Sequence, residues 1–313
     1  MVDQRRTGAG GGIESSEVMQ AAEAAGEEYG KVEGRTQREI VWRRFKRHRL
    51  ALISAFVLIL LYISAIGAPV FAPYGYEEQD FTRINQPPSA ENIMGTDRLG
   101  RDTFSRVLYG GRVSLMVGLG VGVFSTALGA GLGIISGYYG RAVDVGIMGL
   151  TDFVLVLPFL PVMLVLGSIF RFTPLTITLV LIVLIWTQIA RLVRGEVLSL
   201  RDREFVQAAR AIGVSDFKIM VRHILPNVVG VITVQATLTV ALAILLESAL
   251  SFLGLGIQPP TPSWGNMLTD ARTTMTQQWW LTIFPGMMIV ITTLCINFLG
   301  DGLRDALDPK AVE

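Results

Sequence analysis

The chain has 313 residues, of which 51% are hydrophobic and 17% are charged. A soluble domain of this size would carry about 25% charged residues. Here the apolar residues are also gathered into long runs, which excludes a soluble protein and indicates a membrane protein. The formal net charge of +1 gives no information about partners, so that information has to come from the distribution of the charges.

The first 34 residues differ in composition from the rest of the chain. A glycine run and an Ala/Glu-rich stretch have little to bury, which predicts a flexible cytoplasmic tail. A signal peptide is not expected, because the first apolar run starts too late and is too long. Residues 43–49 are strongly basic and follow Trp42. We expect this cluster to contact membrane lipid at the inner headgroup layer, and we expect no nucleic acid to bind there.

Six apolar runs are each near or above the ~20 residues that cross ~30 Å of hydrocarbon as a helix. Backbone groups in lipid must form their hydrogen bonds within the segment. The predicted fold class is therefore an all-α integral membrane protein with six transmembrane helices. The predicted spans are residues 50–71, 113–137, 145–170, 174–193, 228–251 and 280–299.

The positions of Lys and Arg predict the orientation in the membrane. An even number of spans places both termini on one side. If that side is the cytoplasm, seventeen of the Lys and Arg residues around the spans lie inside and seven lie outside. Because positive charge is enriched on the cytoplasmic side, we expect both termini to be cytoplasmic. The loop between the fourth and fifth spans would then be cytoplasmic too.

The segment between the first two spans, residues 72–112, is long for a loop, and its densest part at 95–102 reads GTDRLGRD. One interpretation is a turn followed by a helix cap, with Asp102 capping the helix that runs into the second span. The other is a divalent-cation site at Asp97 and Asp102, although two carboxylates without a histidine make a small ligand set.

Glycines recur every four residues in the second span, at 118 and 122 and again at 129, 133 and 137. Small residues on one helical face let another helix approach closely. We interpret these glycines as packing residues, and the alternative is that they line a path through the membrane.

Two carboxyl groups lie at membrane depth, Asp152 in the third span and Glu247 near the outer end of the fifth. An ionisable group at that depth is by default a functional-site hypothesis, so both are candidate residues of a transport pathway. Pro158 and Pro161 predict a kink in the third span, which would suit a helix that changes shape between states.

The loop between the fourth and fifth spans, residues 204–226, is predicted to form two short amphipathic helices. Apolar residues recur at helical spacing from 205 to 212 and again from 217 to 224. Gly213 separates the two helices, Ser215 offers a cap for the second, and Pro226 is expected to end it before the next span. Such a loop indicates a docking partner. The alternatives are an interfacial helix that lies on the membrane and an ordinary cytoplasmic loop that packs on its own spans.

Three prolines stiffen the loop between the fifth and sixth spans, at 259, 260 and 262, so this segment cannot be a span. A rigid external loop with an exposed aromatic could dock a partner, and the alternative is that Trp264 anchors the loop in lipid headgroups. The candidate docking residues are Gln258, Pro259, Pro260, Trp264 and Gly265.

The chain lacks the residues that catalysis of its own would need. None of its four lysines lies in a Gly-Lys-Ser/Thr motif, so no P-loop and no ATP site is expected. Cys295, the single cysteine, is expected to be buried in the sixth span. The two histidines belong to no cluster with metal-ligand spacing. We therefore expect no catalytic residue, no metal and no cofactor bound by this chain.

The loop at 204–226 resembles the EAA loop of permease subunits in ABC importers, whose consensus is Glu-Ala-Ala-x3-Gly-x9-Ile-x-Leu-Pro. Gln207 replaces the acid of that consensus and His223 replaces its isoleucine, while Glu204 lies one turn earlier and could supply an acid. The family's loop docks into a groove of the ATP-hydrolysing subunit. The coupling residues that the resemblance implies are Glu204, Phe205, Ala208, Ala209, Gly213, Leu225 and Pro226.

Three further stretches, at 92–106, 247–265 and 297–309, resemble the C-type permease subunit of dipeptide, oligopeptide and nickel importers. The resemblance covers most of the chain from about residue 38 onward. It implies a type I importer permease with two ATP-binding subunits that use ATP and Mg, a second permease subunit in a heterodimer, and an external substrate-binding protein.

The expected organisation is a tail at 1–34, an anchor with the first span and external segment at 35–112, a five-helix core at 113–300 and a cytoplasmic tail at 301–313. The expected function is peptide import by alternating access across the cell (inner) membrane. Nickel chelates or oligosaccharides are alternative substrates. A self-contained secondary transporter is a second alternative, but neither an internal repeat nor an ion site supports it.

Overall fold

The structure, a computed structural model, describes residues 37–307. The predicted tail at 1–34 and the chain after Leu307 lie outside the described residues. The chain divides into a unit of residues 1–43 and a unit of residues 44–313, and the helices from α3 onward belong to the second unit.

Every named element within residues 37–307 is helical, and the β-type pairing there is an isolated bridge between Thr96 and Asp102. The predicted all-α class is therefore confirmed. The helices are α2 (Gln37–Arg47), α3 (Arg49–Ile66), α4 (Ala68–Phe71), α5 (Thr103–Tyr139), α6 (Arg141–Val156), α7 (Phe159–Ile169), α8 (Pro174–Leu200), α9 (Glu204–Ala211), α10 (Asp216–Ile219), a π-helical turn (Met220–Ile224), α11 (Leu225–Phe252), α12 (Trp264–Ala271) and α13 (Trp280–Leu307).

Among the described residues, five helical stretches are long and apolar enough to cross a membrane, and α6 with α7 makes a sixth span if the bent pair is counted as one. The two helices of that pair meet at an angle of 82°. The kink predicted from the prolines is thus a complete break. Leu157 is extended, as residues before proline prefer, and Pro158 lacks the N–H that would continue α6.

Several helices extend beyond the predicted spans, α8 to Leu200 and α13 to Leu307 among them, and two further differences have a clear local cause. The second span begins at Thr103 and not at 113, because the side chain of Asp102 caps α5 ten residues earlier than the apolar run suggests. Pro226 does not end a helix. It lies in the first turn of α11, and the preceding π turn, in which the Leu225 N–H bonds to the Met220 carbonyl, carries the helix past the proline ring.

Helix α5 is the central helix of the bundle and packs against α8, α11 and α3. Its glycines face two different neighbours. A Cβ atom on Gly122 would lie 2.2 Å from Val240 of α11, and one on Gly133 would lie 2.6 Å from the Ala190 carbonyl of α8. The packing interpretation of the glycine series is confirmed, because these close approaches leave no space for a side chain.

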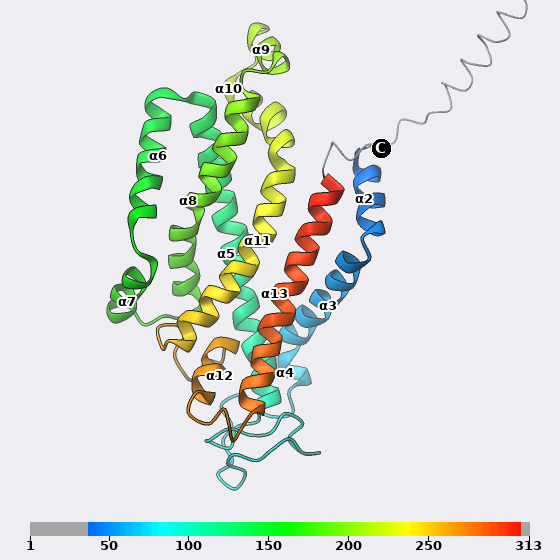
Figure 1. Cartoon of the computed structure of the whole chain (residues 1–313), viewed down its shortest axis with the longest axis vertical. Helices are drawn as coiled ribbons and strands as arrows, with labels where there is room; N and C mark the ends of the chain where they lie inside the picture. The colour runs from blue at the N-terminus through cyan, green and yellow to red at the C-terminus, as the bar shows by residue number, and fades with distance from the viewer. Residues whose placement is uncertain (1–36, 308–313) are drawn as a thin grey trace, which may run out of the picture. The chain divides into compact units, whose positions relative to one another are not determined.

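The bundle has two different ends (Figure 1). At the α9 end, α9 and α10 lie at the same end as the C-terminal residues of α13, and Leu307 packs near Gly230. At the α12 end, α12 lies beside the irregular segment of residues 72–102, which we name the α12-end strap. Helix α5 runs the whole distance between the two ends.

Candidate functional site

The two-helix loop, residues 204–226, has a buried face and an exposed apolar face. Val206 and Ala209 of α9 and Ile219 of α10 pack inward against the hydrophobic core. On the other face Ile212 is 81% exposed and Phe217 is 70% exposed. Large apolar side chains exposed together on a short structured loop are typical of a surface that another protein covers.

Gly213 ends α9 as predicted, because its backbone adopts φ +81°, which side chains rarely tolerate. Its N–H bonds to the Arg210 carbonyl and closes the helix. Ser215 occupies the N-cap position of α10, but its side chain makes no capping hydrogen bond. Instead Asp216, the first residue of α10, accepts a 2.6 Å hydrogen bond from the Tyr138 hydroxyl of α5.

The remaining predicted coupling residues lie on both faces of the loop. Glu204, Phe205 and Ala208 are exposed, Leu225 is partly buried and Pro226 is exposed. Ala209 is buried, so a charged substitution there would disrupt the folding of the loop before it could report on docking.

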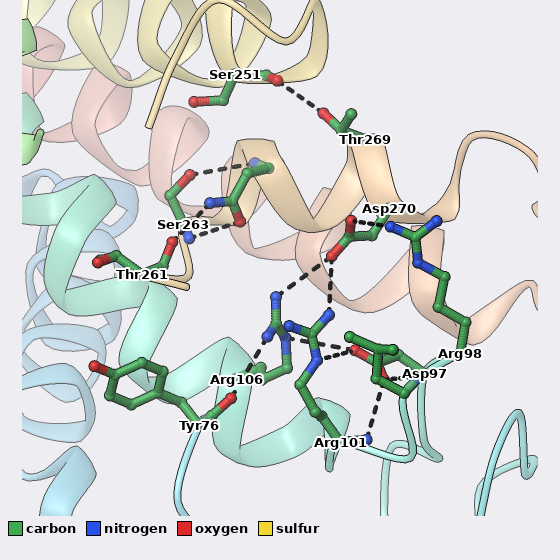
Figure 2. A network of polar contacts seen from close by, with 12 residues as sticks. Tyr76, Asp97, Arg98, Arg101, Arg106, Ser251, Thr261, Ser263, Thr269 and Asp270 are labelled. Carbon is green, nitrogen blue, oxygen red and sulfur yellow. Dashed lines mark hydrogen bonds and ion pairs between the residues drawn. The ribbon is translucent and has the colours of Figure 1, made fainter. Parts of the chain in front are cut away.

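At the α12 end, a buried network of two arginines and two aspartates joins three segments of the chain (Figure 2). We name Asp97, Arg101, Arg106 and Asp270 the Arg–Asp network. The Arg101 Nε atom donates to Asp97 at 2.7 Å, and its Nη2 atom donates to Asp270 at 3.2 Å. The guanidinium of Arg106 lies 3.8 Å from Asp97 and 3.5 Å from Asp270.

Each arginine of the network therefore touches both aspartates. The buried charges of Asp97, Arg101 and Arg106 are thus paired, as burial requires. The partly buried Asp270 is also reached by the exposed Arg98 at 3.5 Å. Asp97 belongs to the α12-end strap, Arg106 to α5 and Asp270 to α12. The network consequently ties the strap and α12 to one end of α5.

Asp102 caps α5 as predicted, with its Oδ2 atom 2.8 Å from the Ser105 N–H. Its other oxygen accepts from Asn92 at 2.8 Å. Asp97 is occupied by the arginines and by the Leu99 N–H. Both carboxylates are thus committed to donors, and among residues 37–307 no group of three His, Cys, Asp or Glu could hold a metal ion. The geometry favours the cap interpretation over the cation site.

Trp264 is 2% exposed, so the expectation of an exposed aromatic is wrong, and so is the alternative of a headgroup anchor. Its indole N–H donates to the Val107 carbonyl of α5 at 3.0 Å. Gly265 is buried as well, because a Cβ there would lie 2.6 Å from Ser248. The reason is that residue 263 starts α12 through a capping box with Asn266, which turns Trp264 inward.

Gln258, Pro259 and Pro260 remain exposed. Gln258 and Pro259 line a pocket of about 390 Å³ together with residues of the α7–α8 connection, among them Arg171 and Phe170. The part of the predicted docking loop that is open to a partner is therefore its proline stretch.

Glu247 is fully buried between α5, α11 and α12, so it lines no open path in this conformation. Its two carboxyl oxygens accept from the Ser114 hydroxyl at 3.1 Å and the Ser251 hydroxyl at 2.8 Å. The Ser114 hydroxyl oxygen also accepts a hydrogen bond from the backbone N–H of Trp264. Glu247 thus holds the start of α12 against two long helices.

Asp152 is exposed and forms a 2.5 Å ion pair with Arg191 of α8. Farther along the same two helices, Arg194 of α8 donates two hydrogen bonds of 2.5 and 2.6 Å to Asp144 of α6. Helix α6 is thus joined to α8 by two ion pairs, while most of its remaining surface is exposed.

Sequence reasoning missed Tyr138, Asp270 and the burial of Trp264. The partners of Asp270 lie 164 and 169 residues earlier in the chain, and those of Trp264 lie 150 and 157 residues earlier. No local spacing connects residues so far apart. Only the positions of Arg101 and Arg106, close in the sequence to Asp97, could have indicated a charged partner.

Two family profiles match the chain. The profile of the binding-protein-dependent transport system inner membrane component matches residues 129–313, and that of the N-terminal TM domain of oligopeptide transport permease C matches residues 36–88.

Similar curated proteins cover nearly the whole chain. The dipeptide transport system permease protein DppC of Bacillus subtilis (strain 168) is 42% identical over 270 residues, which are 86% of this chain and 84% of that protein. The oligopeptide transport system permease protein OppC of Mycobacterium tuberculosis (strain ATCC 25618 / H37Rv) is 41% identical over 281 residues, 88% of this chain and 96% of that protein. OppC of Haemophilus influenzae is 41% identical over 282 residues, 90% and 91% of the two chains.

Proposed function

The chain belongs to the family of binding-protein-dependent transport system inner membrane components, the permease subunits of ABC importers, and we propose that its substrates are di- or oligopeptides. The substrate class rests on the names of the relatives, which are dipeptide and oligopeptide permeases. Nickel chelates and oligosaccharides are the alternatives to exclude.

The single observation that supports the coupling role is the exposed apolar face of the two-helix loop. Phe217 and Ile212 are among the exposed large side chains of the chain, and they lie beside the glycine-hinged pattern that resembles the EAA loop. One of the two ATP-binding partner subunits would cover this face. Both subunits would bind and hydrolyse ATP with Mg, and this chain would contribute no ATP site.

The proposed orientation follows from the charges. With the α9 end in the cytoplasm, most of the Lys and Arg residues around the spans lie inside. The C-terminal end of α13 then lies on the same side as the two-helix loop. The strap, α12 and the proline stretch would then face outward. The membrane would be the cell (inner) membrane of a prokaryote-type cell.

A second permease subunit would complete the pathway in a heterodimer. The supporting surface is the exposed side of α6, where Val145, Phe153 and Val156 are exposed. Gly146 and Gly149 offer close approach on this helix, because the described residues leave the space around them empty.

Transport would proceed by alternating access. ATP binding closes the partner subunits, they displace the two-helix loop, and the five-span core from about residue 113 moves between inward and outward openings. Asp152, paired with Arg191 on the exposed side of α6, is proposed to line the cytoplasmic half of the path. The external binding protein would deliver substrate at Gln258, Pro259 and Pro260.

The coupling role is tested with two phenylalanines of similar exposure at opposite ends. Phe217→Asp places a charge on the two-helix loop, and Phe81→Asp places one on the α12-end strap, where Phe81 is 67% exposed. We expect Phe217→Asp to remove the copurifying ATP-binding subunit, with a loss of at least about tenfold. Phe81→Asp should retain that subunit. Equal retention by both variants would contradict the proposed docking surface.

The substrate class is tested by competition. Vesicles that contain the complex and its binding protein should accumulate a radiolabelled tripeptide, and unlabelled peptides should suppress this uptake. Suppression by nickel chelates or oligosaccharides, with no effect of peptides, would move the assignment to those substrates.

A further inference from the structure

The end of α5 packs against the π turn Met220–Ile224 of the two-helix loop and also contacts the loop through one buried tyrosine, Tyr138. Its hydroxyl donates to Asp216 of α10 at 2.6 Å. Its ring lies under the guanidinium of Arg210 of α9, with the Arg210 Cζ atom 5.4 Å from the ring centroid. Tyr138 therefore contacts both short helices of the loop, on either side of the Gly213 hinge.

Arg210 and Asp216 carry opposite charges on either side of Gly213, and Tyr138 contacts both. The neighbouring Tyr138 side chain is the main cause that raises the pKa of Arg210 above its ordinary value. The Tyr138 hydroxyl donates to the Asp216 carboxylate. Hydrogen bonds to charged groups are shorter and about twice as strong as neutral ones, and stacking of a cation on the ring adds to them.

Helix α5 is not adjacent to the loop in the sequence, because the loop lies between α8 and α11. Its end is nevertheless held at a second point, because the Arg201 guanidinium donates to the Gly137 carbonyl at 3.2 Å. The neighbouring Tyr139 is half exposed, and its hydroxyl makes no hydrogen bond with the described residues. Tyr138 therefore makes the polar side-chain contacts of α5 with the loop, while the helix also packs against the π turn.

Helix α5 is also the element that reaches the other end of the bundle. It has 37 residues without a proline, which corresponds to about 55 Å of uninterrupted helix. Its first turn is capped by Asp102, and Arg106 joins it to the Arg–Asp network. A displacement applied at Tyr138 would thus be carried by one stiff helix to the strap and α12.

We propose that Tyr138, Arg210 and Asp216 form the joint through which the two-helix loop moves α5, and that Tyr138 is a positioning residue for the coupling of ATP hydrolysis to transport. This inference rests on the proposed function of the loop. It extends that function by assigning a separate group of contacts, on the buried side of the loop, to transmission. The exposed face of Phe217 and Ile212 serves docking, and the Tyr138 side serves the transfer of movement.

The test compares two adjacent tyrosines in the intact complex. Tyr138→Phe removes one hydroxyl and retains the ring, and Tyr139→Phe removes a hydroxyl that bonds to none of the described residues. The complex with its copurifying subunits is reconstituted in liposomes with its binding protein. Uptake is measured with whichever of trialanine, a nickel–histidine chelate or maltotriose the wild type accumulates, and ATP hydrolysis is measured in the same samples.

We expect Tyr138→Phe to lower uptake per ATP hydrolysed about tenfold, the effect of one charge-assisted hydrogen bond. The ATP-binding subunits should copurify as in the wild type, and Tyr139→Phe should match the wild type in every measurement. Asp216→Ala, which removes the acceptor of the Tyr138 hydroxyl, should give a similar loss. The double variant Tyr138→Phe with Asp216→Ala should fall no further than the worse single variant, because both remove the same bond.

If Tyr138→Phe takes up as much substrate per ATP hydrolysed as the wild type, the proposed joint is wrong. Loss of the ATP-binding subunits in Tyr138→Phe would also overturn it, because Tyr138 would then serve only the folding of the loop. A wild-type complex that contains no ATP-binding subunit would be a failure of the proposed function itself. That outcome is distinguishable because it appears before any substitution is made.

Discussion

The two ends of α5 differ in which side chains the chain itself pairs and buries. At the α12 end, the four charged residues of the Arg–Asp network pair with one another largely away from water, and Trp264 is enclosed by its own chain. At the α9 end, Phe217 and Ile212 remain exposed on a loop of two short helices. The α12-end strap also carries exposed apolar side chains, Phe81 and Ile93 among them. What separates the two ends is therefore the paired charge and the enclosed Trp264 at one end, and two short helices hinged at Gly213 at the other.

The largest difference between the ends should appear at their aspartates. Asp97→Ala leaves two buried arginines short of a partner, which should lower the free energy of unfolding by about 3–5 kcal/mol. Asp202→Ala removes an exposed 3.5 Å pair with Arg201 near the two-helix loop and should cost less than about 1 kcal/mol. Thermal unfolding of the purified variants in detergent measures both. Equal losses would mean that the Arg–Asp network is open to solvent.

Two isoleucines of the two-helix loop differ in burial, since Ile224 is fully buried and Ile212 is exposed. Ile224→Ala should lower the free energy of unfolding by about 2–5 kcal/mol, while Ile212→Ala should change it by less than about 0.5 kcal/mol. Copurification of the ATP-binding subunit should respond to Ile212→Ala at unchanged stability. A stability loss at Ile212 would show that this face is buried within the chain.

The smallest expected effects concern the helix that joins the two ends. A Cβ on Gly129 would lie 2.5 Å from the Trp186 carbonyl, whereas one on Gly131 meets none of the described residues within 4 Å. Gly129→Ala should destabilise the protein by about 1–3 kcal/mol because the α5–α8 contact is overpacked. Gly131→Ala should be neutral or stabilise by up to about 1 kcal/mol, because alanine favours helix. Identical shifts in the midpoint of thermal unfolding would argue against the close contact.

Features set by local chemistry could be predicted from the sequence. The Asp102 cap and the Gly213 break depend on neighbouring residues and on φ, and the glycine series depends on helical period. Each of these expectations was confirmed. The third span was predicted as a kink and is a break, because Leu157 and Pro158 together stop α6.

The remaining features depend on contacts between distant segments. Pro226 was expected to end a helix, but the π turn before it allows the helix to continue. Trp264 was expected at a surface, because its sequence neighbours give no sign of the α5 carbonyl that its indole N–H reaches. Asp270 could not be assigned a role until α12 was placed beside α5. The docking roles of the loop residues remain proposals.

Isolation of the tagged chain from its own membranes in mild detergent would show whether ATP-binding subunits cover the exposed face at the α9 end. Mass spectrometry then identifies and quantifies what copurifies. We expect an ATP-binding subunit and a second multi-span permease in amounts comparable to this chain. A stable, monodisperse protein without an ATP-binding subunit would contradict the proposed docking, and Asp152 would then be the first residue to test in a self-contained transporter.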